Sequence, residues 1–303
     1  MAAVPAAGPA LLPLGMLLAL GVIWGLSFPV AKIAAKYGVP ALGYVAWQTL
    51  GAGAILLIVC LLRGTPPRLS WKSCRYYAFS GFYGIAFPNV VLQLAIAEMP
   101  AGIAAIIVNT TSLLTYGLAL AFAMERFRWL HLTGLGCGFA GALLLLLPKA
   151  SLPTPEMAGW VAFGFITPFS YAIANIFNTR HRPASDGSLA IACGTLFGAA
   201  CWVVPMALAF DQFHAVGSPL GAGDAAILAQ VLISSIAYIL VFEVLRLAGA
   251  VYFSQVGYIV ALTALGWGML FFGERHSAWI WAAMALIFAG LFLVNRRRIA
   301  AAG

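Results

Sequence analysis

The stretch NTTSLLTYGLALAFAMERFRWLHLTGLGCGFAG, residues 109–141, decides the fold of this 303-residue chain because its pattern occurs twice. In each copy an apolar run precedes a charged Glu-Arg pair and a second apolar run follows it. A shift of 149 positions aligns Gly117 with Gly266, Phe122 with Phe271, Glu125-Arg126 with Glu274-Arg275, and Phe139-Ala140-Gly141 with Phe288-Ala289-Gly290. A period close to half of the chain length indicates a duplicated unit.

Composition predicts that the chain lies in a membrane. Hydrophobic residues make up 63% of it, charged residues make up 8%, and the mean hydropathy is +1.01. Such a chain could not cover itself with a polar surface in water. Its apolar runs have the length of about 20 residues that a helix needs to cross a hydrocarbon core of about 30 Å. They lack the polar and apolar alternation of barrel strands, so we predict an all-α polytopic membrane protein.

Ten transmembrane helices fit the chain, with short connections that are rich in Gly and Pro. The expected spans are residues 12–36, 41–62, 73–98, 101–123, 129–147, 157–179, 188–210, 224–245, 249–272 and 277–295. Five spans form a first repeat, residues 11–150, and five form a second, residues 156–298, within a single membrane domain. Because five is odd, the second repeat enters the membrane from the other side. This predicts an inverted-topology repeat, which is typical of secondary transporters.

The basic residues predict the orientation in the membrane. With both termini in the cytoplasm, the inner connections hold 12 of the 16 Lys and Arg residues, and only Lys32, Lys36, Lys149 and Arg275 lie outside. The positive-inside rule therefore predicts cytoplasmic N- and C-termini. The net charge of +8 arises from residues at span ends and forms no separate basic domain, so we expect no nucleic-acid partner.

Polar and aromatic side chains within the spans form the candidate solute site, because lipid tails cannot satisfy buried polar groups. We expect solute contacts from Trp24, Phe28, Tyr83, Asn89, Gln93, Asn109, Thr110, Ser112, Tyr171, Asn175, Tyr238, Gln255 and Tyr258. Such neutral groups and rings would suit a small zwitterionic or amphipathic solute. Each Ser and Thr has the alternative of bonding only to helix backbone. Tyr44 lies near a span end and is expected to be an interfacial anchor.

Gly and Pro recur four residues apart in the first and sixth spans, as Gly25 with Pro29 and as Gly164 with Pro168. Proline removes a backbone hydrogen bond and crowds the preceding turn, so a helix is weakened there. The matching positions in the two halves favour hinges at these four residues. The alternative is that they are ordinary membrane-helix residues that do not move.

The charged residues argue against several other functions. All eight acidic residues lie at or near span ends, so no carboxylate is expected at mid-membrane to relay protons or sodium ions. Glu243 comes nearest and is expected to pair with Arg246. The four His residues lack the spacing of a metal site, and no phosphate-binding glycine loop is present. We therefore expect no enzyme activity, no cofactor and no metal.

The chain resembles the EamA type of the drug/metabolite transporter superfamily. The resemblance rests on ten spans in two inverted halves, a Glu-Arg pair after the fourth and ninth spans, and Trp24-Gly25 with Pro29 in the first span. It covers nearly the whole chain, and within the family it is greatest to the YddG-type exporters of aromatic and other amino acids. The family commonly has Pro in the middle of spans four and nine, where this chain has residues 109–112 and 255–258 without Pro.

The resemblance implies a multi-pass bacterial inner-membrane exporter of aromatic and other neutral amino acids, working by alternating access at a cavity between its halves. Its partners would be the solute and the lipid bilayer. Two alternatives stay open: an exporter of cationic drugs or other small metabolites, and a membrane scaffold or receptor-like protein without transport. Glycines in the first and fifth spans permit close helix approach, which would serve either a monomer or a homodimer.

Overall fold

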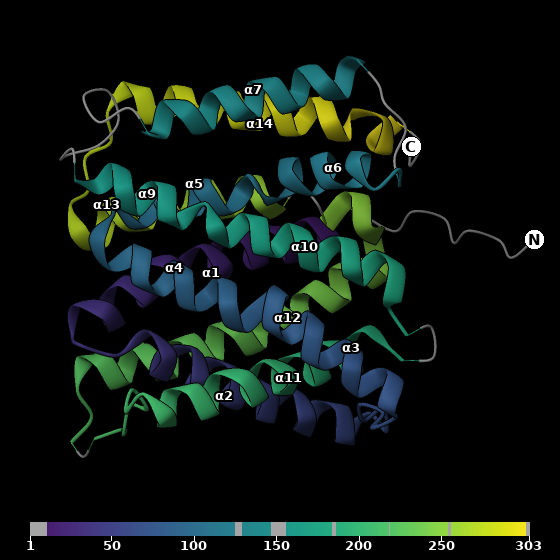
Figure 1. Ribbon diagram of the computed structural model, residues 1–303, viewed down its shortest axis with the longest axis vertical. Helices are drawn as coiled ribbons and strands as arrows, with labels where there is room; N and C mark the ends of the chain where they lie inside the picture. The colour runs from purple at the N-terminus through teal and green to yellow at the C-terminus, as the bar shows by residue number, and fades with distance from the viewer. Residues whose placement is uncertain are drawn as a thin grey trace, which may run out of the picture.

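The computed structural model describes residues 11–124, 129–146, 156–183, 186–217, 219–253 and 256–300. Within these residues every regular element is a helix and there is no strand. The helices lie side by side along one direction, and α1 begins at the end of the bundle where α14 finishes (Figure 1). We call this the terminal end and the other the opposite end. The predicted all-α fold is therefore confirmed.

The helices of the first half are α1 (Leu11–Lys36), α2 (Ala41–Leu62), α3 (Trp71–Gly81), the π-helix η1 (Phe82–Ala86), α4 (Phe87–Glu98), α5 (Ala101–Asn109), α6 (Thr111–Ala121) and α7 (Trp129–Leu146). Those of the second half are α9 (Met157–Gly164), α10 (Ile166–His181), α11 (Ser188–Ala209), α12 (Ala222–Phe253), α13 (Val256–Phe272) and α14 (Ala278–Ala300).

Seven helical segments of the described chain are long and apolar enough to cross a membrane. Three shorter apolar helices, Leu132–Leu144, Val256–Phe272 and Ala278–Gly290, lie where the fifth, ninth and tenth spans are expected. By length and composition the protein is a multi-pass membrane protein, whereas the count of ten crossings stays a prediction.

The predicted boundary between the eighth and ninth spans was wrong. Residues 249–253, expected to begin the ninth span, continue α12 instead. A single Gly is tolerated within a helical pattern, and residues 242–253 contain no Pro that would end the helix. The apolar pattern alone could not locate the break for this reason.

The third expected span changes its helical geometry near the middle, from α3 through η1 to α4. Pro88 lacks an N–H group and crowds the preceding turn, and the Phe87 N–H bonds to Phe82 O, five residues earlier. Hydroxyl groups of α10 bond to backbone oxygens beside this irregular turn. Ser170 Oγ donates to Tyr83 O at 2.7 Å, and Thr167 Oγ1 donates to Pro88 O at 3.2 Å. Neighbouring helices commonly satisfy the backbone in this way within membranes.

The two Gly-Pro pairs differ in the structure. α1 continues through Pro29, whereas the sixth expected span breaks at Phe165, three residues before Pro168. A Cβ atom at Gly25 would clash with Thr263 of α13, while one at Gly164 would lie 3.2 Å from Met99 Cε, the end of a flexible side chain that would have to shift slightly. Gly25 therefore allows α1 to approach α13 closely. The hinge roles of all four residues stay predictions.

The pair α7 and α14 packs together at one edge of the bundle (Figure 1). A Cβ atom at Gly290 would clash with the backbone of Gly134, and one at Gly141 would lie 2.7 Å from Ala283 O. Close approach through small residues is a common way for membrane helices to associate. Gly141 and Gly290 thus serve packing within one chain.

The centre of the bundle is formed around α1, which packs against α12, α13 and α4. α5 packs against α13, and α6 packs chiefly against α10. Fully buried side chains such as Leu20, Ile103 and Leu265 fill the contacts among these helices. The fourth span therefore packs against α13 before its break and against α10 after it. A cavity lies next to this break.

Candidate solute-binding site

A cavity of about 510 Å³ lies among helices of both halves, next to η1 and the break between α5 and α6. Its volume falls within the range of roughly 300–1,000 Å³ that is typical of small-molecule sites. The wall combines aromatic rings, amides and hydroxyls with apolar side chains such as Leu92, Ile96 and Val260. None of the lining residues that the structure describes is Asp, Glu, Lys, Arg or His.

Nine of the thirteen expected contact residues line this cavity: Trp24, Phe28, Asn89, Gln93, Asn109, Ser112, Tyr171, Asn175 and Tyr238. They belong to α1, α4, α5, α6, α10 and α12, so the fold brings together residues that are far apart in the sequence. Contact between these residues and a solute stays a prediction.

Three expected contact residues do not line the cavity, although each has a neighbour in sequence that does. The Tyr83 ring packs on Phe79, with ring centroids 4.7 Å apart. Tyr258 packs edge-on against Phe288 of α14, with centroids 4.7 Å apart. Its neighbour Gly257 lines the cavity, and successive helical residues point about 100° apart, so Tyr258 faces elsewhere.

Thr110, the third of these residues, is buried at the break between α5 and α6, and its Oγ1 donates to Ile107 O at 2.7 Å. Thr111 Oγ1 likewise donates to Val108 O at 2.5 Å, and Asn109 Nδ2 donates to Ala105 O at 3.0 Å. Such local side-chain bonds compete with regular helix geometry. The polar patch at 109–112 therefore supports the helix break as well as forming part of the wall. Gln255, the remaining expected contact, lies outside the described residues.

Hydrogen bonds between helices hold several wall side chains in place. Tyr171 of α10 donates through its hydroxyl to Asn89 Oδ1 of α4 at 2.6 Å. Asn175 Nδ2 donates to Thr115 Oγ1 of α6 at 3.2 Å, and Gln93 Nε2 donates to Ala31 O of α1 at 2.9 Å. These bonds hold the side chains of Gln93, Tyr171 and Asn175 in place without a bound solute.

Two glutamines of the wall were not recognised from the sequence. Gln48 Nε2 of α2 and Gln230 Nε2 of α12 both donate to Ser234 Oγ, each at 3.1 Å. Buried amides are costly in membranes and mark functional or packing contacts. The same argument that selected Gln93 would have selected these two residues.

The prediction that Tyr44 is an interfacial anchor was wrong, because Tyr44 lines the cavity. Only 4% of it is exposed. The connection after α11 folds over the beginning of α2, where Trp47 Nε1 donates to His214 O at 2.7 Å and Gly43 lies against Gln212 O. This long-range contact covers a span end that sequence position alone would place at the membrane surface.

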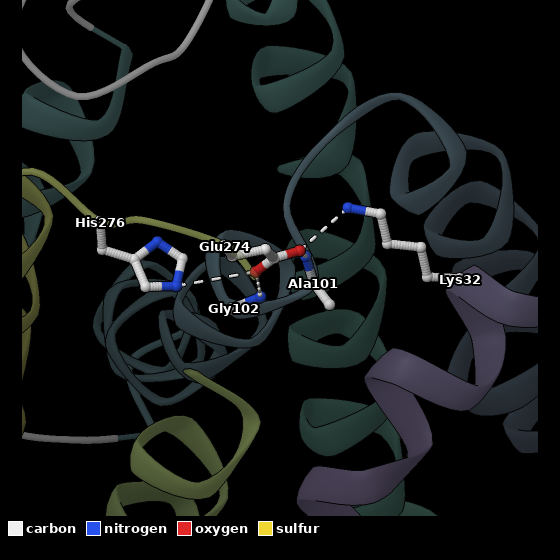
Figure 2. A network of polar contacts seen from close by, with 5 residues as sticks. All are labelled: Lys32, Ala101, Gly102, Glu274 and His276. Carbon is white, nitrogen blue, oxygen red and sulfur yellow. Dashed lines mark hydrogen bonds and ion pairs between the residues drawn. The ribbon is translucent and has the colours of Figure 1, made fainter. Parts of the chain in front are cut away.

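Glu274 follows the end of α13, at the opposite end of the bundle, and lies among three segments (Figure 2). The sequence predicted a boundary residue, but only 8% of its side chain is exposed. Its Oε1 accepts from Lys32 Nζ and from the Ala101 N–H, both at 2.9 Å, and its Oε2 accepts from the Gly102 N–H at 3.5 Å. The first turn of a helix has unpaired N–H groups and favours negative charge. Glu274 therefore caps α5 and ties it to α1 and α13.

His276 completes this network, with 2% of its side chain exposed and its Nε2 3.6 Å from Glu274 Oε2. Burial lowers the pKa of His276, Glu274 opposes that shift, and Lys32 adds to it. The imidazole is consequently neutral at neutral pH. Glu125, which corresponds to Glu274 in the first repeat, lies outside the described residues.

Other ion pairs lie at the terminal end. Glu243, expected to pair with Arg246, lies 3.2 Å from Arg63, which directly follows α2. The side chain of Arg246 is outside those described. Asp186 accepts from Tyr77 Oη at 2.9 Å and lies 3.5 Å from Arg68 Nε. Both acids connect helices, which sequence spacing did not indicate.

Comparison with known proteins agrees with this architecture. The sequence profile of the EamA-like transporter family matches residues 11–147 and 158–296. The uncharacterized inner membrane transporter YedA of Escherichia coli strain K12 is 28% identical over 292 residues, which cover 94% of this chain and 91% of that protein. A probable terminal-alkyne amino-acid exporter of Streptantibioticus cattleyicolor is 23% identical over 282 residues, which cover 92% of this chain and 91% of that protein. A solved crystal structure covers 93% of this chain and 96% of its own, with a TM-score of 0.64 at 18% identity, and shows the likeness of fold.

Proposed function

Because this chain belongs to the EamA-like transporter family, we propose that it is a bacterial inner-membrane transporter that exports neutral amino acids, aromatic ones among them, by alternating access. The inner-membrane location is supported by its likeness to YedA. The amino-acid class is supported by its likeness to the probable terminal-alkyne amino-acid exporter.

The observation that carries the proposal is a cavity without charge among its described lining residues. A zwitterion brings its own compensating charges, so its net charge needs no neutralising partner in the wall. A cationic drug would leave an unpaired charge in a low-dielectric site, which is unfavourable. The cavity therefore favours a neutral amino acid over a cation.

The wall also offers a place for an apolar or aromatic side chain. Leu92, Ile96, Val108 and Val260 line the cavity together with the rings of Trp24 and Phe28. Sites for small molecules are commonly apolar, with a few polar groups that fix the orientation. Such a wall suits neutral amino acids with large side chains. This is the solute class that the resemblance to the YddG-type exporters implies.

Alternating access would expose the cavity first to one side and then to the other. We place both termini in the cytoplasm, so the Glu274 network would hold the outer ends of α1, α5 and α13 together. With no carboxylate among the described cavity residues, transport would proceed by facilitated export or exchange without a carboxylate relay.

The proposal is tested by efflux from proteoliposomes that contain the purified chain and are loaded with labelled L-phenylalanine or, separately, labelled tetraphenylphosphonium. We expect L-phenylalanine to leave faster than from protein-free vesicles, and the cation to show no such increase. Asn109→Ala should slow efflux, whereas Tyr37→Phe, at an exposed residue outside the cavity, should not. Efflux of the cation alone would support the drug exporter, and efflux of neither would support the scaffold.

A further inference from the structure

Three buried polar atoms belonging to cavity residues have no hydrogen-bond partner. They are Ser27 Oγ on α1, Tyr44 Oη on α2 and Gln230 Oε1 on α12. Buried polar groups in proteins are nearly always paired, and each exception needs an explanation. Three exceptions among the residues of one cavity indicate that a bound molecule supplies the missing partners.

The hydrogen bonds nearby determine which group each residue offers. Gln48 and Gln230 both direct their amide nitrogens at Ser234 Oγ. The carbonyl oxygen of Gln230 is therefore left as a free acceptor. Ser27 and Tyr44 each have a hydroxyl proton that is free to be donated, because the structure gives neither oxygen a partner.

We propose that Ser27, Tyr44 and Gln230 form a head-group subsite, in which the two hydroxyls donate to the carboxylate of an amino acid and the Gln230 oxygen accepts from its ammonium group. This inference rests on the proposed function and assigns its specificity to one side of the cavity. The three atoms are buried and belong to side chains of the cavity wall, so binding would require these side chains to turn toward the head group.

The chemistry of the three groups matches a zwitterion more closely than either ion alone. The two hydroxyl donors would bind the carboxylate, which only accepts hydrogen bonds. The Gln230 oxygen would bind the ammonium group, which only donates them. Hydrogen bonds to ionised partners are stronger than those between neutral groups. A solute that lacked either charge would leave part of the subsite unpaired and would carry a net charge into a neutral cavity.

The subsite also explains how a single transporter can accept several side chains. The head group binds to a fixed polar set, while the side chain lies against apolar residues such as Leu92 and Val260. Discrimination is strong where a missing solute group leaves buried polar atoms unpaired, and weaker where only methylene groups differ. We expect strict selection for the head group and broad selection for the side chain.

The test measures binding of L-phenylalanine to the purified full chain in detergent by titration calorimetry. Two analogues compete with it: 2-phenylethylamine, which has no carboxylate, and 3-phenylpropanoate, which has no ammonium group. The variants are Tyr44→Phe and Gln230→Met, which remove the polar groups and nearly keep the shapes. Tyr37→Phe and Gln212→Met make the same changes at exposed residues outside the cavity and serve as controls.

We expect Tyr44→Phe to weaken L-phenylalanine binding by about tenfold, the value of one hydrogen bond to a charged group, and to leave 2-phenylethylamine binding unchanged. Gln230→Met should weaken L-phenylalanine by a similar factor and leave 3-phenylpropanoate unchanged. Tyr44→Phe should also melt no lower than the parent chain without solute, because it removes a hydroxyl that had no partner.

The inference is overturned if both variants bind L-phenylalanine as the parent chain does. It is also overturned if Tyr44→Phe weakens 2-phenylethylamine equally, or if its melting temperature falls, because the hydroxyl would then serve the fold. In each of these cases L-phenylalanine still binds to the parent chain, and the proposed function stands. Absence of both binding and efflux in the parent chain would instead defeat the proposed function itself.

Discussion

At the scale of single residues, the carboxylate of Glu274 holds the opposite end of the bundle together. It pairs with Lys32 and accepts from the Ala101 N–H, while Lys32 Nζ also lies 5.0 Å from the centre of the Phe272 ring. Removing one partner of a buried ion pair leaves the other without compensation, which typically costs about 3–5 kcal/mol. This network is therefore a sensitive point of the structure.

We predict that Glu274→Gln lowers the free energy of unfolding by about 3 kcal/mol, the lower part of that range, because Lys32 is partly exposed and can turn to water. Lys32→Met should cost less, since Glu274 keeps its bonds to the start of α5. Unfolding by SDS titration in mixed micelles measures both. Glu98→Gln, at an exposed residue of the same end, is the control, and an equal loss there would contradict the account.

The buried His276 predicts a dependence of stability on pH. Burial lowers its pKa in the folded chain below the ordinary value of 6.5. As the pH falls from 6.5 toward that lower pKa, the unfolded chain binds a proton that the folded chain does not, so stability falls. The cost is absent above pH 6.5. His276→Asn should remove it.

The measurement is the melting temperature of the parent chain and of His276→Asn between pH 7.5 and 5.5. We expect the parent chain to lose more stability than the variant as the pH falls. His181→Asn makes the same change at an exposed histidine at the end of α10 and serves as the matched substitution control. Parallel profiles for the parent and His276→Asn would show that the pKa of His276 does not differ between the folded and unfolded chains, which contradicts the prediction.

The sequence predicted polar residues of the cavity better than it predicted which way they face. The cost of burying amides pointed to Gln93 and Asn109, which line the cavity, and it applies equally to Gln48, which was missed. It could not show that Tyr258 turns toward Phe288, because the facing side of a helix depends on its neighbours. The burial of Tyr44 arises from a loop distant in sequence and has no local signal.

At the scale of the elements, apolar length located α2 at the predicted residues, because Pro40 begins the helix and charged and turn residues follow it. The breaks at Thr110 and Phe165 were not predicted, because local side-chain bonds and packing between helices decide them. The glycines of α7 were recognised as packing residues, but their partner helix α14 became clear only from the fold.

We predict that Gly290→Ala destabilises the contact between α7 and α14. Its Cβ atom would meet the backbone of Gly134 and Gly138, which cannot move aside as a side chain can. A Cβ atom at Gly136 would have no neighbouring heavy atom within 4 Å. Gly136→Ala should therefore be neutral or stabilising by up to about 1 kcal/mol, as expected for Gly to Ala in a helix. Melting temperatures in detergent compare the two. Equal values would contradict the proposed packing.

At the scale of the whole molecule, the repeat and the excess of basic residues predict inverted halves with both termini in the cytoplasm. A reporter fused after residue 300 tests this orientation. Activity of alkaline phosphatase, which requires export from the cytoplasm, should be absent there, while that of green fluorescent protein should be present. The reverse result would invert the assignment of the two ends and place the Glu274 network on the cytoplasmic side.

The proposed transporter carries amino acids across the membrane through a neutral cavity without a carboxylate relay. Counterflow tests it most directly: proteoliposomes with the purified chain are preloaded with unlabelled L-phenylalanine and diluted into a trace of the labelled form, with no ion gradient and no nucleotide. We expect label to accumulate transiently inside, less so with Tyr44→Phe and equally with Tyr37→Phe. Label that enters no faster than into protein-free vesicles would contradict it.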